Sequence, residues 1–141
     1  MKAHIGKAHW EGNLKEGRGE ISTGSGALDK IAYGFNTRFA EEPGTNPEEL
    51  LGAAHAACFT MALSKELGDA GMTANALDTT AKVRLEQTSA GFSITRIDLV
   101  LHAKIPDGDP QTFETCAERA KSNCPVSRLF NTKITLEHHL E

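Results

Sequence analysis

Two cysteines and a few charged side chains are the residues of this 141-residue chain that could carry chemistry. Cys58 lies in the middle of a largely apolar stretch, Thr45–Leu67. A thiol reacts as a nucleophile only in its thiolate form, which a nearby positive charge stabilises. Without such a charge, cysteine packs as a small hydrophobic side chain, because free cysteine is among the most buried residue types. The stretch by itself leaves both interpretations of Cys58 open.

Two side chains could bring positive charge to Cys58. His55 precedes it by three residues, and side chains at this spacing are neighbours on a helix. Arg38 comes just before the loop that leads into the helix, and an arginine that enters an apolar site needs a carboxylate partner. Helical geometry places Glu48 about 80° from Cys58 in projection and Glu49 roughly opposite. We therefore expect Glu48 to hold Arg38, and Glu49 to be a solvated charge in the first helical turn.

Cys124 is a second candidate thiol, 66 positions after Cys58. It precedes Pro125 and is expected to cap a short helix, where the free N–H groups and the helix dipole favour a thiolate. The spacing alone does not say whether the two cysteines are close in space. Cys116 lies within a predicted helix without charged residues arranged around it, and we expect it to fill the core.

Composition argues against several classes of function. The net charge is −4 with acids and bases interspersed, which is unlike a nucleic-acid-binding protein. No stretch approaches the ~20 apolar residues of a membrane helix, and the N-terminal segment lacks a signal-peptide pattern. Three cysteines in a chain of ordinary core composition indicate a reducing compartment, the cytoplasm, rather than a disulfide scaffold.

A metal site is not expected from this sequence. No histidines and cysteines cluster at zinc-ligand spacing. His138 and His139 are adjacent on a predicted strand, where successive side chains point to opposite faces and cannot chelate one ion.

The predicted elements alternate between strands and helices. Asn46 and Pro47 are typical of a helix start, and this central helix is expected to run from Pro47 to Leu67 and to end at Gly68 and Gly71. Strands are expected over 3–13, with Ile5 and Trp10 pointing inward, around Ile21, and over 28–39, 76–86, 92–105 and 133–139, with further helices over 112–122 and 125–130. This order predicts a single α+β domain over residues 1–141, with helices packed on an antiparallel sheet.

The predicted central helix is apolar on every side. From Leu50 to Leu63 only His55 and Thr60 are clearly polar. A helix that is apolar all round belongs in an interior, and so few strands cannot cover roughly 31 Å of it. We infer a homodimer in which two such helices pack in a shared core.

Three segments resemble the OsmC/Ohr family, which comprises osmotically inducible protein C and the organic hydroperoxide resistance proteins. They are YGFNTRF with Arg38, GTNPEELLGAAHAACFTMAL around Cys58, and KSNCPVSRLF around Cys124. The opening AHWEG and the ending TKITLEHHLE are similar to the OsmC branch in particular. The resemblance covers essentially the whole chain, with the motifs in the family's order.

The resemblance implies a thiol-dependent peroxidase that reduces organic hydroperoxides and hydrogen peroxide in oxidative and osmotic stress defence. Cys58 would be peroxidatic and become a sulfenic acid. Cys124 would resolve it as a disulfide, which a dithiol reductant of the lipoyl type would reduce. Arg38 would stabilise the thiolate and the developing alkoxide, and Glu48 would hold Arg38.

The resemblance also implies an OsmC-like fold, in which antiparallel sheets pack around long central helices in an intertwined homodimer with two sites at the subunit interface. It implies no metal or organic cofactor, and it gives His55 and Cys116 no chemical role. The alternative function is a non-enzymatic dimeric binding protein with a pocket for an apolar stress-related ligand. Thiol titration separates the two, because an ordinary cysteine pKa of about 8.5 at Cys58 favours the binding protein.

Overall fold

A computed structural model describes residues 2–141 of the chain. Its contacts divide the chain into two compact units, the first ending at Leu50 and the second running from Leu51 to Glu141. The prediction of a single domain over residues 1–141 stays a prediction. Over residues 2–141, none of the helices combines the length and the apolar character that crossing a membrane requires.

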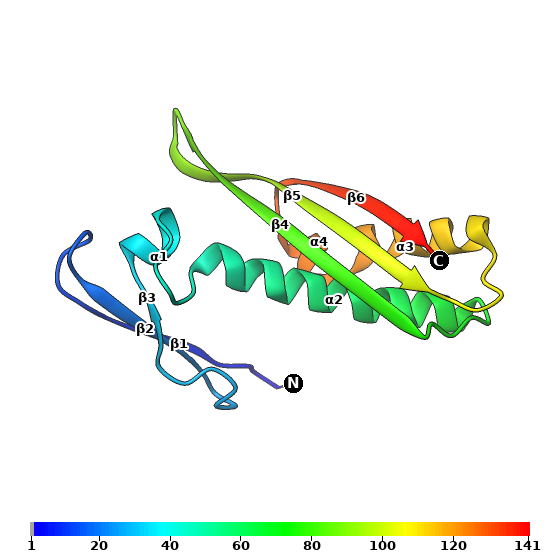
Figure 1. Cartoon of the computed structure of the whole chain (residues 1–141), viewed down its shortest axis with the longest axis horizontal. Coiled ribbons are helices and arrows are strands. Elements are labelled where there is room, and N and C mark those ends of the chain that lie inside the picture. The colour runs from blue at the N-terminus through cyan, green and yellow to red at the C-terminus, as the bar shows by residue number, and fades with distance from the viewer. Residues whose placement is uncertain (1) are drawn as a thin grey trace. The chain divides into compact units, whose positions relative to one another are not determined.

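The first unit contains a three-stranded antiparallel sheet. The strands β1 (Gly6–Glu11), β2 (Arg18–Thr23) and β3 (Ile31–Tyr33) pair in chain order (Figure 1). Trp10 is half-buried, as predicted, and its ring packs against that of Tyr33 with 5.6 Å between the centroids. Ile5 is 59% exposed, so the prediction that it points inward is wrong, because it precedes the paired part of β1.

The stretch predicted as a strand over 28–39 is extended only in part. Its last residues form the short helix α1 (Phe35–Phe39). The apolar residues Ile31, Tyr33, Phe35 and Phe39 suggested an extended run. Phe35 and Phe39 are also four residues apart and therefore share one face of a helix. Their ring centroids lie 4.9 Å apart. Arg38 is consequently a helical residue rather than the end of a strand.

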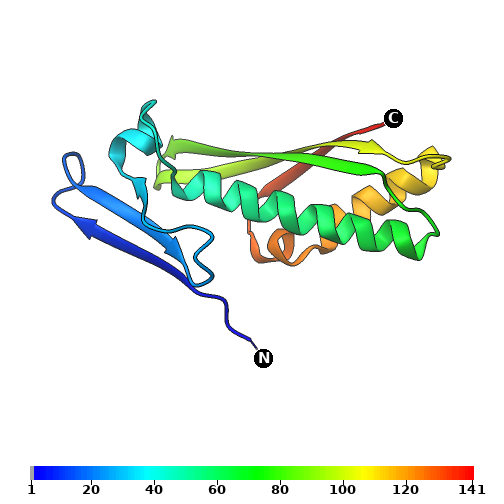
Figure 2. The same cartoon turned by 60° about the horizontal axis from the view of Figure 1, so that its bottom comes forward.

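The second unit is a three-stranded sheet covered by helices on one face. Its strands are β4 (Ala76–Thr88), β5 (Gly91–Lys104) and β6 (Lys133–Leu140). The helices α2 (Pro47–Asp69), of which most belongs to this unit, α3 (Pro110–Asn123) and α4 (Pro125–Leu129) lie on the same side of the sheet (Figure 2). The predicted helices and strands of this unit are therefore present, with ends shifted by a few residues.

One strand departs from the predicted antiparallel sheet. β4 and β5 form an antiparallel hairpin, but β6 pairs with β5 in parallel, from Arg96 opposite Lys133 to Ala103 opposite Leu140. Parallel neighbours need a crossover connection, and α3 and α4 provide it between the two strands. The sheet is therefore mixed, while the predicted α+β class is confirmed.

The core of the second unit lies between this sheet and its helices. Side chains from alternate positions of β5 meet side chains spaced by four residues on α2 and the inner face of α3. The core residues are Phe59, Leu63, Leu67, Ile97, Leu99, Leu101, Ala103, Ile105, Phe113, Cys116, Ala117, Ala120 and Cys124. Cys116 is 3% exposed and its thiol donates to the carbonyl oxygen of Glu66 at 3.6 Å, so its prediction as a core residue is confirmed.

Candidate functional site

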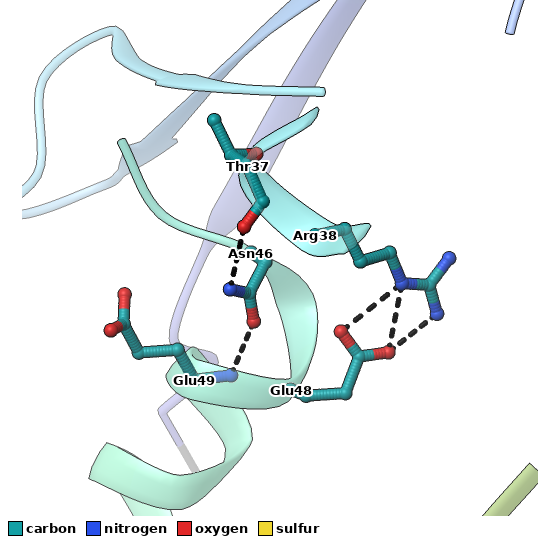
Figure 3. Close-up of polar contacts among 5 residues, drawn as sticks. All are labelled: Thr37, Arg38, Asn46, Glu48 and Glu49. Carbon is teal, nitrogen blue, oxygen red and sulfur yellow. Dashed lines mark hydrogen bonds and ion pairs between the residues drawn. The ribbon is translucent and has the colours of Figure 1, made fainter. Parts of the chain in front are cut away.

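In the first unit, Arg38 and Glu48 form a two-point ion pair (Figure 3). The Nε of Arg38 donates to both carboxylate oxygens, at 3.0 and 3.1 Å, and Nη2 donates to Oε1. The planar guanidinium matches a carboxylate in this way, which fixes its orientation as well as its charge. The acid is the more buried partner, because the side chain of Glu48 is 10% exposed and that of Arg38 is 36% exposed. The Nη1 nitrogen makes none of these three bonds.

Asn46 joins the start of α2 to α1 and so positions the ion pair. Its side-chain oxygen accepts the N–H of Glu49 at 2.8 Å, which is the predicted helix cap, and its side-chain nitrogen donates to the carbonyl of Thr37 at 3.1 Å (Figure 3). These bonds hold the residue before Arg38 against the first turn of α2. Glu49 is exposed and points away from the guanidinium in Figure 3. The prediction that Glu48 rather than Glu49 holds Arg38 is therefore confirmed.

In the second unit, the two predicted thiols lie next to each other. Cys58 is half-buried on α2, and Cys124 is fully buried at the cap of α4. Burial raises the pKa of the Cys58 thiol, and the hydrogen bond and charge of Cys124 raise it further. The backbone N–H of Val126, in the first turn of α4, lowers that pKa. The fold thus brings together two cysteines whose proximity the spacing left open, and both are free thiols.

Ser127 contacts Cys124 through two of its atoms, although the sequence analysis did not identify it. Its N–H donates to the Cys124 sulfur at 3.3 Å, which confirms Cys124 as a helix cap, and its hydroxyl oxygen accepts the thiol proton at 3.1 Å. The same hydroxyl lies 2.7 Å from Nε2 of His55. The signal that could have identified Ser127 is its place three residues after a cap, where a backbone N–H bonds the cap side chain.

His55 is buried and neutral near pH 7. Burial lowers the pKa of its imidazole, and its ring packs edge-on against Phe130 with 5.4 Å between the centroids. Its Nδ1 is buried and has no hydrogen-bond partner among the described residues. His55 therefore cannot supply the positive charge that the sequence analysis considered for Cys58.

The histidines near the C-terminus do not form a chelating pair. His138 packs edge-on against Phe113 and His139 stacks on His102, so the two side chains lie on opposite faces of β6, as predicted. Over residues 2–141, no three histidine, cysteine or acidic side chains are grouped so that they could hold a metal ion.

Comparison with known proteins identifies one family. Residues 40–139 match the family described as OsmC-like protein. Over 136 residues the chain is 54% identical to "Peroxiredoxin OsmC" of Escherichia coli (strain K12), covering 96% of this chain and 95% of that protein. An OsmC-like protein from Vibrio cholerae has a similar structure, with a TM-score of 0.79 at 18% identity over 99% and 100% of the two chains. An organic hydroperoxide resistance protein OsmC from Legionella pneumophila has a TM-score of 0.71 at 26% identity over 100% and 98%.

Proposed function

Because this chain belongs to the OsmC-like protein family, we propose that Cys58 and Cys124 are the redox-active pair of its peroxidase activity. The chain is a hydroperoxide-reducing peroxidase, in keeping with its 54% identity to a peroxiredoxin across almost its full length. The observation that supports the assignment of the two residues is the interaction between their side chains. The thiol of Cys116 is hydrogen-bonded to the backbone of α2, and we assign this residue no part in the redox chemistry.

The proposed cycle has three steps. The Cys58 thiolate attacks the distal oxygen of the hydroperoxide, the O–O bond breaks, and the products are a sulfenic acid and an alkoxide that takes a proton to become an alcohol. The sulfur of Cys124 then attacks the sulfur of Cys58, the S–O bond breaks, and water leaves as the disulfide forms. A dithiol, which we propose is of the lipoyl type, reduces this disulfide by exchange and is itself oxidised to a disulfide.

We propose that Arg38 supplies the positive charge that Cys58 needs. Burial and Cys124 both raise the pKa of Cys58, and the groups that shift this pKa in the described chain include no cation. A thiol with a raised pKa reacts slowly, because the thiolate is the nucleophile. A guanidinium is a permanent cation under physiological conditions, and Glu48 holds that of Arg38 in one orientation through Nε and Nη2. Arg38 would thus stabilise the thiolate and the leaving alkoxide, and Glu48 would position it.

We also propose that the protein is a homodimer of the cytoplasm. One face of α2 is buried, whereas the opposite face carries exposed small and apolar side chains, of which Met61 is 76% exposed. A second copy that presents the same face would cover this patch. The three free thiols fit a reducing compartment.

Mass spectrometry with peptide mapping tests the redox pair. Reduced protein treated with one equivalent of cumene hydroperoxide should lose two hydrogens and contain a Cys58–Cys124 disulfide, which dihydrolipoamide should reverse. Cys58→Ser should stay folded and lose peroxide turnover, whereas Cys116→Ser, the matched control, should keep both the disulfide and the turnover. Persistent free thiols in the wild type, or a disulfide to Cys116, would overturn the proposal and favour a binding protein for apolar ligands.

A further inference from the structure

We propose that Ser127 and His55 form a proton relay for Cys124, in which the Ser127 hydroxyl takes the thiol proton and passes its own proton to the imidazole. The inference rests on the proposed function, because it concerns the step in which Cys124 attacks the sulfenic acid. Ser127 touches the reacting sulfur and would be a catalytic residue. His55 acts through Ser127 and would be the terminal base.

The hydrogen bonds of the three residues form one continuous chain, and in the proposed relay Nε2 of His55 carries no proton and accepts from Ser127. The thiol of Cys124 donates to the Ser127 hydroxyl oxygen at 3.1 Å, and this oxygen lies 2.7 Å from Nε2 of His55. A hydroxyl that accepts one proton can donate its own, so the chain runs from thiol to hydroxyl to imidazole. The N–H of Ser127 also points at the sulfur, at 3.3 Å, and stabilises the negative charge that develops as the proton leaves.

Burial explains why Cys124 needs such a relay. Cys124 and His55 are 0% exposed and Ser127 is 7% exposed, so bulk water does not reach the thiol. Disulfide formation nevertheless requires the thiolate of the attacking cysteine. A proton acceptor must therefore lie within hydrogen-bond reach, directly or through one intervening group. In this buried cluster, His55 is the group that meets the requirement.

His55 is suited to pass a proton on rather than to keep it. Desolvation lowers the pKa of its imidazole, and no charged group from the elements packed around it adds to this shift. The cluster also includes the titratable thiols of Cys58 on α2 and of Cys124 at the cap of α4, and the Phe130 ring packs against the imidazole. The buried Nδ1 has no partner among the described residues, so no carboxylate stabilises an imidazolium here.

The proposed step balances in atoms and charge. The proton of the Cys124 thiol moves to Ser127 as the hydroxyl proton moves to His55, and Ser127 remains a hydroxyl throughout. The thiolate attacks the Cys58 sulfur, the S–S bond forms, and the S–O bond breaks. The departing hydroxide takes up one proton and leaves as water, while His55 releases the proton that it received and returns to its neutral form. The net step therefore neither gains nor loses a proton. When the disulfide is reduced, the same chain can return a proton to Cys124.

Rapid-quench mass spectrometry separates the two chemical steps. Reduced protein is mixed with one equivalent of cumene hydroperoxide and quenched with dimedone and N-ethylmaleimide, so that sulfenic acid and disulfide are counted in each sample. His55→Gln can still bond Ser127 but cannot take up a proton, and Ser127→Ala removes the hydroxyl. In both variants we expect disulfide formation to slow on the order of 100-fold and sulfenic acid to accumulate. The double variant should be no slower than the slower single variant, because the two residues act as one unit.

The pH profile of the disulfide step distinguishes a relay from a packing effect. In the wild type the rate should rise only through the pKa of His55, which burial holds below its usual value of about 6.5, and should be flat above neutrality. In His55→Gln and Ser127→Ala no base of the cluster takes the proton, so the thiolate must form by exchange with solvent when the site opens. The rate should then increase about tenfold per pH unit above neutrality. His102→Gln changes an exposed histidine of β5 and serves as the matched control, which should follow the wild type.

The experiment distinguishes a failure of the relay from a failure of the proposed redox pair. Equal disulfide rates and equally flat pH profiles in the wild type, His55→Gln and Ser127→Ala would overturn the relay and leave the redox pair intact. A wild type that forms no Cys58–Cys124 disulfide would instead remove the proposed function itself. If circular dichroism shows that His55→Gln does not fold, Ser127→Ala decides the question alone.

Discussion

At the scale of single residues, the first unit and the second unit offer opposite electrostatic environments. The guanidinium of Arg38 is charged, oriented by a carboxylate and 36% exposed. At Cys58, burial and the neighbouring Cys124 raise the pKa of the thiol and so disfavour its thiolate. The thiolate and the fixed cation are therefore complementary in charge, and the reactivity of Cys58 measures whether they work together.

Replacing Arg38 by Gln should move the pH profile of Cys58 alkylation to higher pH. Without the cation, the effects of burial and of Cys124 remain, and both raise the pKa of Cys58. A smaller thiolate fraction at pH 7 should slow oxidation by hydroperoxide about tenfold for each unit of pKa. The rate of iodoacetamide labelling at the Cys58 peptide, measured from neutral to alkaline pH, reports the shift.

Two neighbouring acids, Glu48 and Glu49, provide a matched test of the Arg38 prediction. Glu48→Gln removes the carboxylate that orients Arg38 and should move the profile in the same direction by a smaller amount. Glu49→Gln changes the exposed acid next to it and should leave the profile in place. Coinciding profiles for the wild type and Arg38→Gln would show that Arg38 is not the stabilising cation.

At the scale of the elements, α2 must approach β4 closely at one end and not at the other. A methyl group added at Gly52 would lie 3.2 Å from the carbonyl oxygen of Ala81, whereas one added at Gly68 would meet nothing within 4 Å. Alanine is favoured over glycine in a helix by about 1 kcal/mol. Gly68→Ala should therefore raise the free energy of unfolding by ~0.5–1 kcal/mol. Gly52→Ala should give no such increase, because the β4 backbone would have to move.

Urea denaturation of Gly52→Ala and Gly68→Ala measures both effects on one helix. Because the same substitution is made twice, helix propensity cancels in the comparison and the close approach to β4 remains. An equal stabilisation at the two positions would contradict the close packing of α2 on the strand.

Asp98 of β5 links the three strands of the second sheet. Its carboxylate accepts hydrogen bonds from Thr135 of β6 at 2.6 Å, from Arg84 of β4 at 2.7 Å, and from Arg96. The Thr135 hydroxyl and the two arginines lower the pKa of Asp98 to about 2, against the opposing effect of burial. This value lies below the usual aspartate pKa of about 3.9. The stabilisation is therefore complete above about pH 4 and is lost as the pH falls towards 2.

Asp98→Asn should lower the free energy of unfolding at pH 7, and the difference from the wild type should shrink as the pH falls from about 4 to about 2. Urea denaturation at several pH values gives this difference. Asp78→Asn changes an exposed carboxylate on β4 and should have little effect at any of them. A difference for Asp98→Asn that is constant with pH would show that the carboxylate contacts are not the cause.

The elements also show what local sequence can and cannot determine. Asn46 and Pro47 begin α2 as predicted, because a cap acts within one helical turn. The direction of β6 was not predictable from its own residues, because the crossover through α3 and α4 sets it. Within the site, the residue order and helical geometry were enough to choose Glu48 for Arg38. Ser127 was missed because its partner His55 lies 72 positions away, and only the fold joins them.

At the scale of the whole molecule, the exposed face of α2 is the surface that we expect a second copy of the chain to cover. The sequence predicted a helix apolar on all sides, and the chain buries one of those sides in the core of the second unit. The remaining side carries three exposed alanines and Met61, namely Ala53, Ala54, Ala57 and Met61. Small side chains allow another backbone to approach closely, so this face suits a helix of the same kind.

Met61→Glu should therefore weaken the proposed homodimer. Light scattering coupled to size-exclusion chromatography should give the wild type a mass of about twice the 15.2 kDa chain. A carboxylate at position 61 would be buried without a partner in the dimer, which disfavours association by several kcal/mol. The variant should dissociate on dilution, while Thr115→Glu, on an exposed position of α3, should keep the wild-type mass. A wild type that is monomeric at all concentrations, or a Met61→Glu variant that stays dimeric, would rule out this face of α2 as the dimer interface.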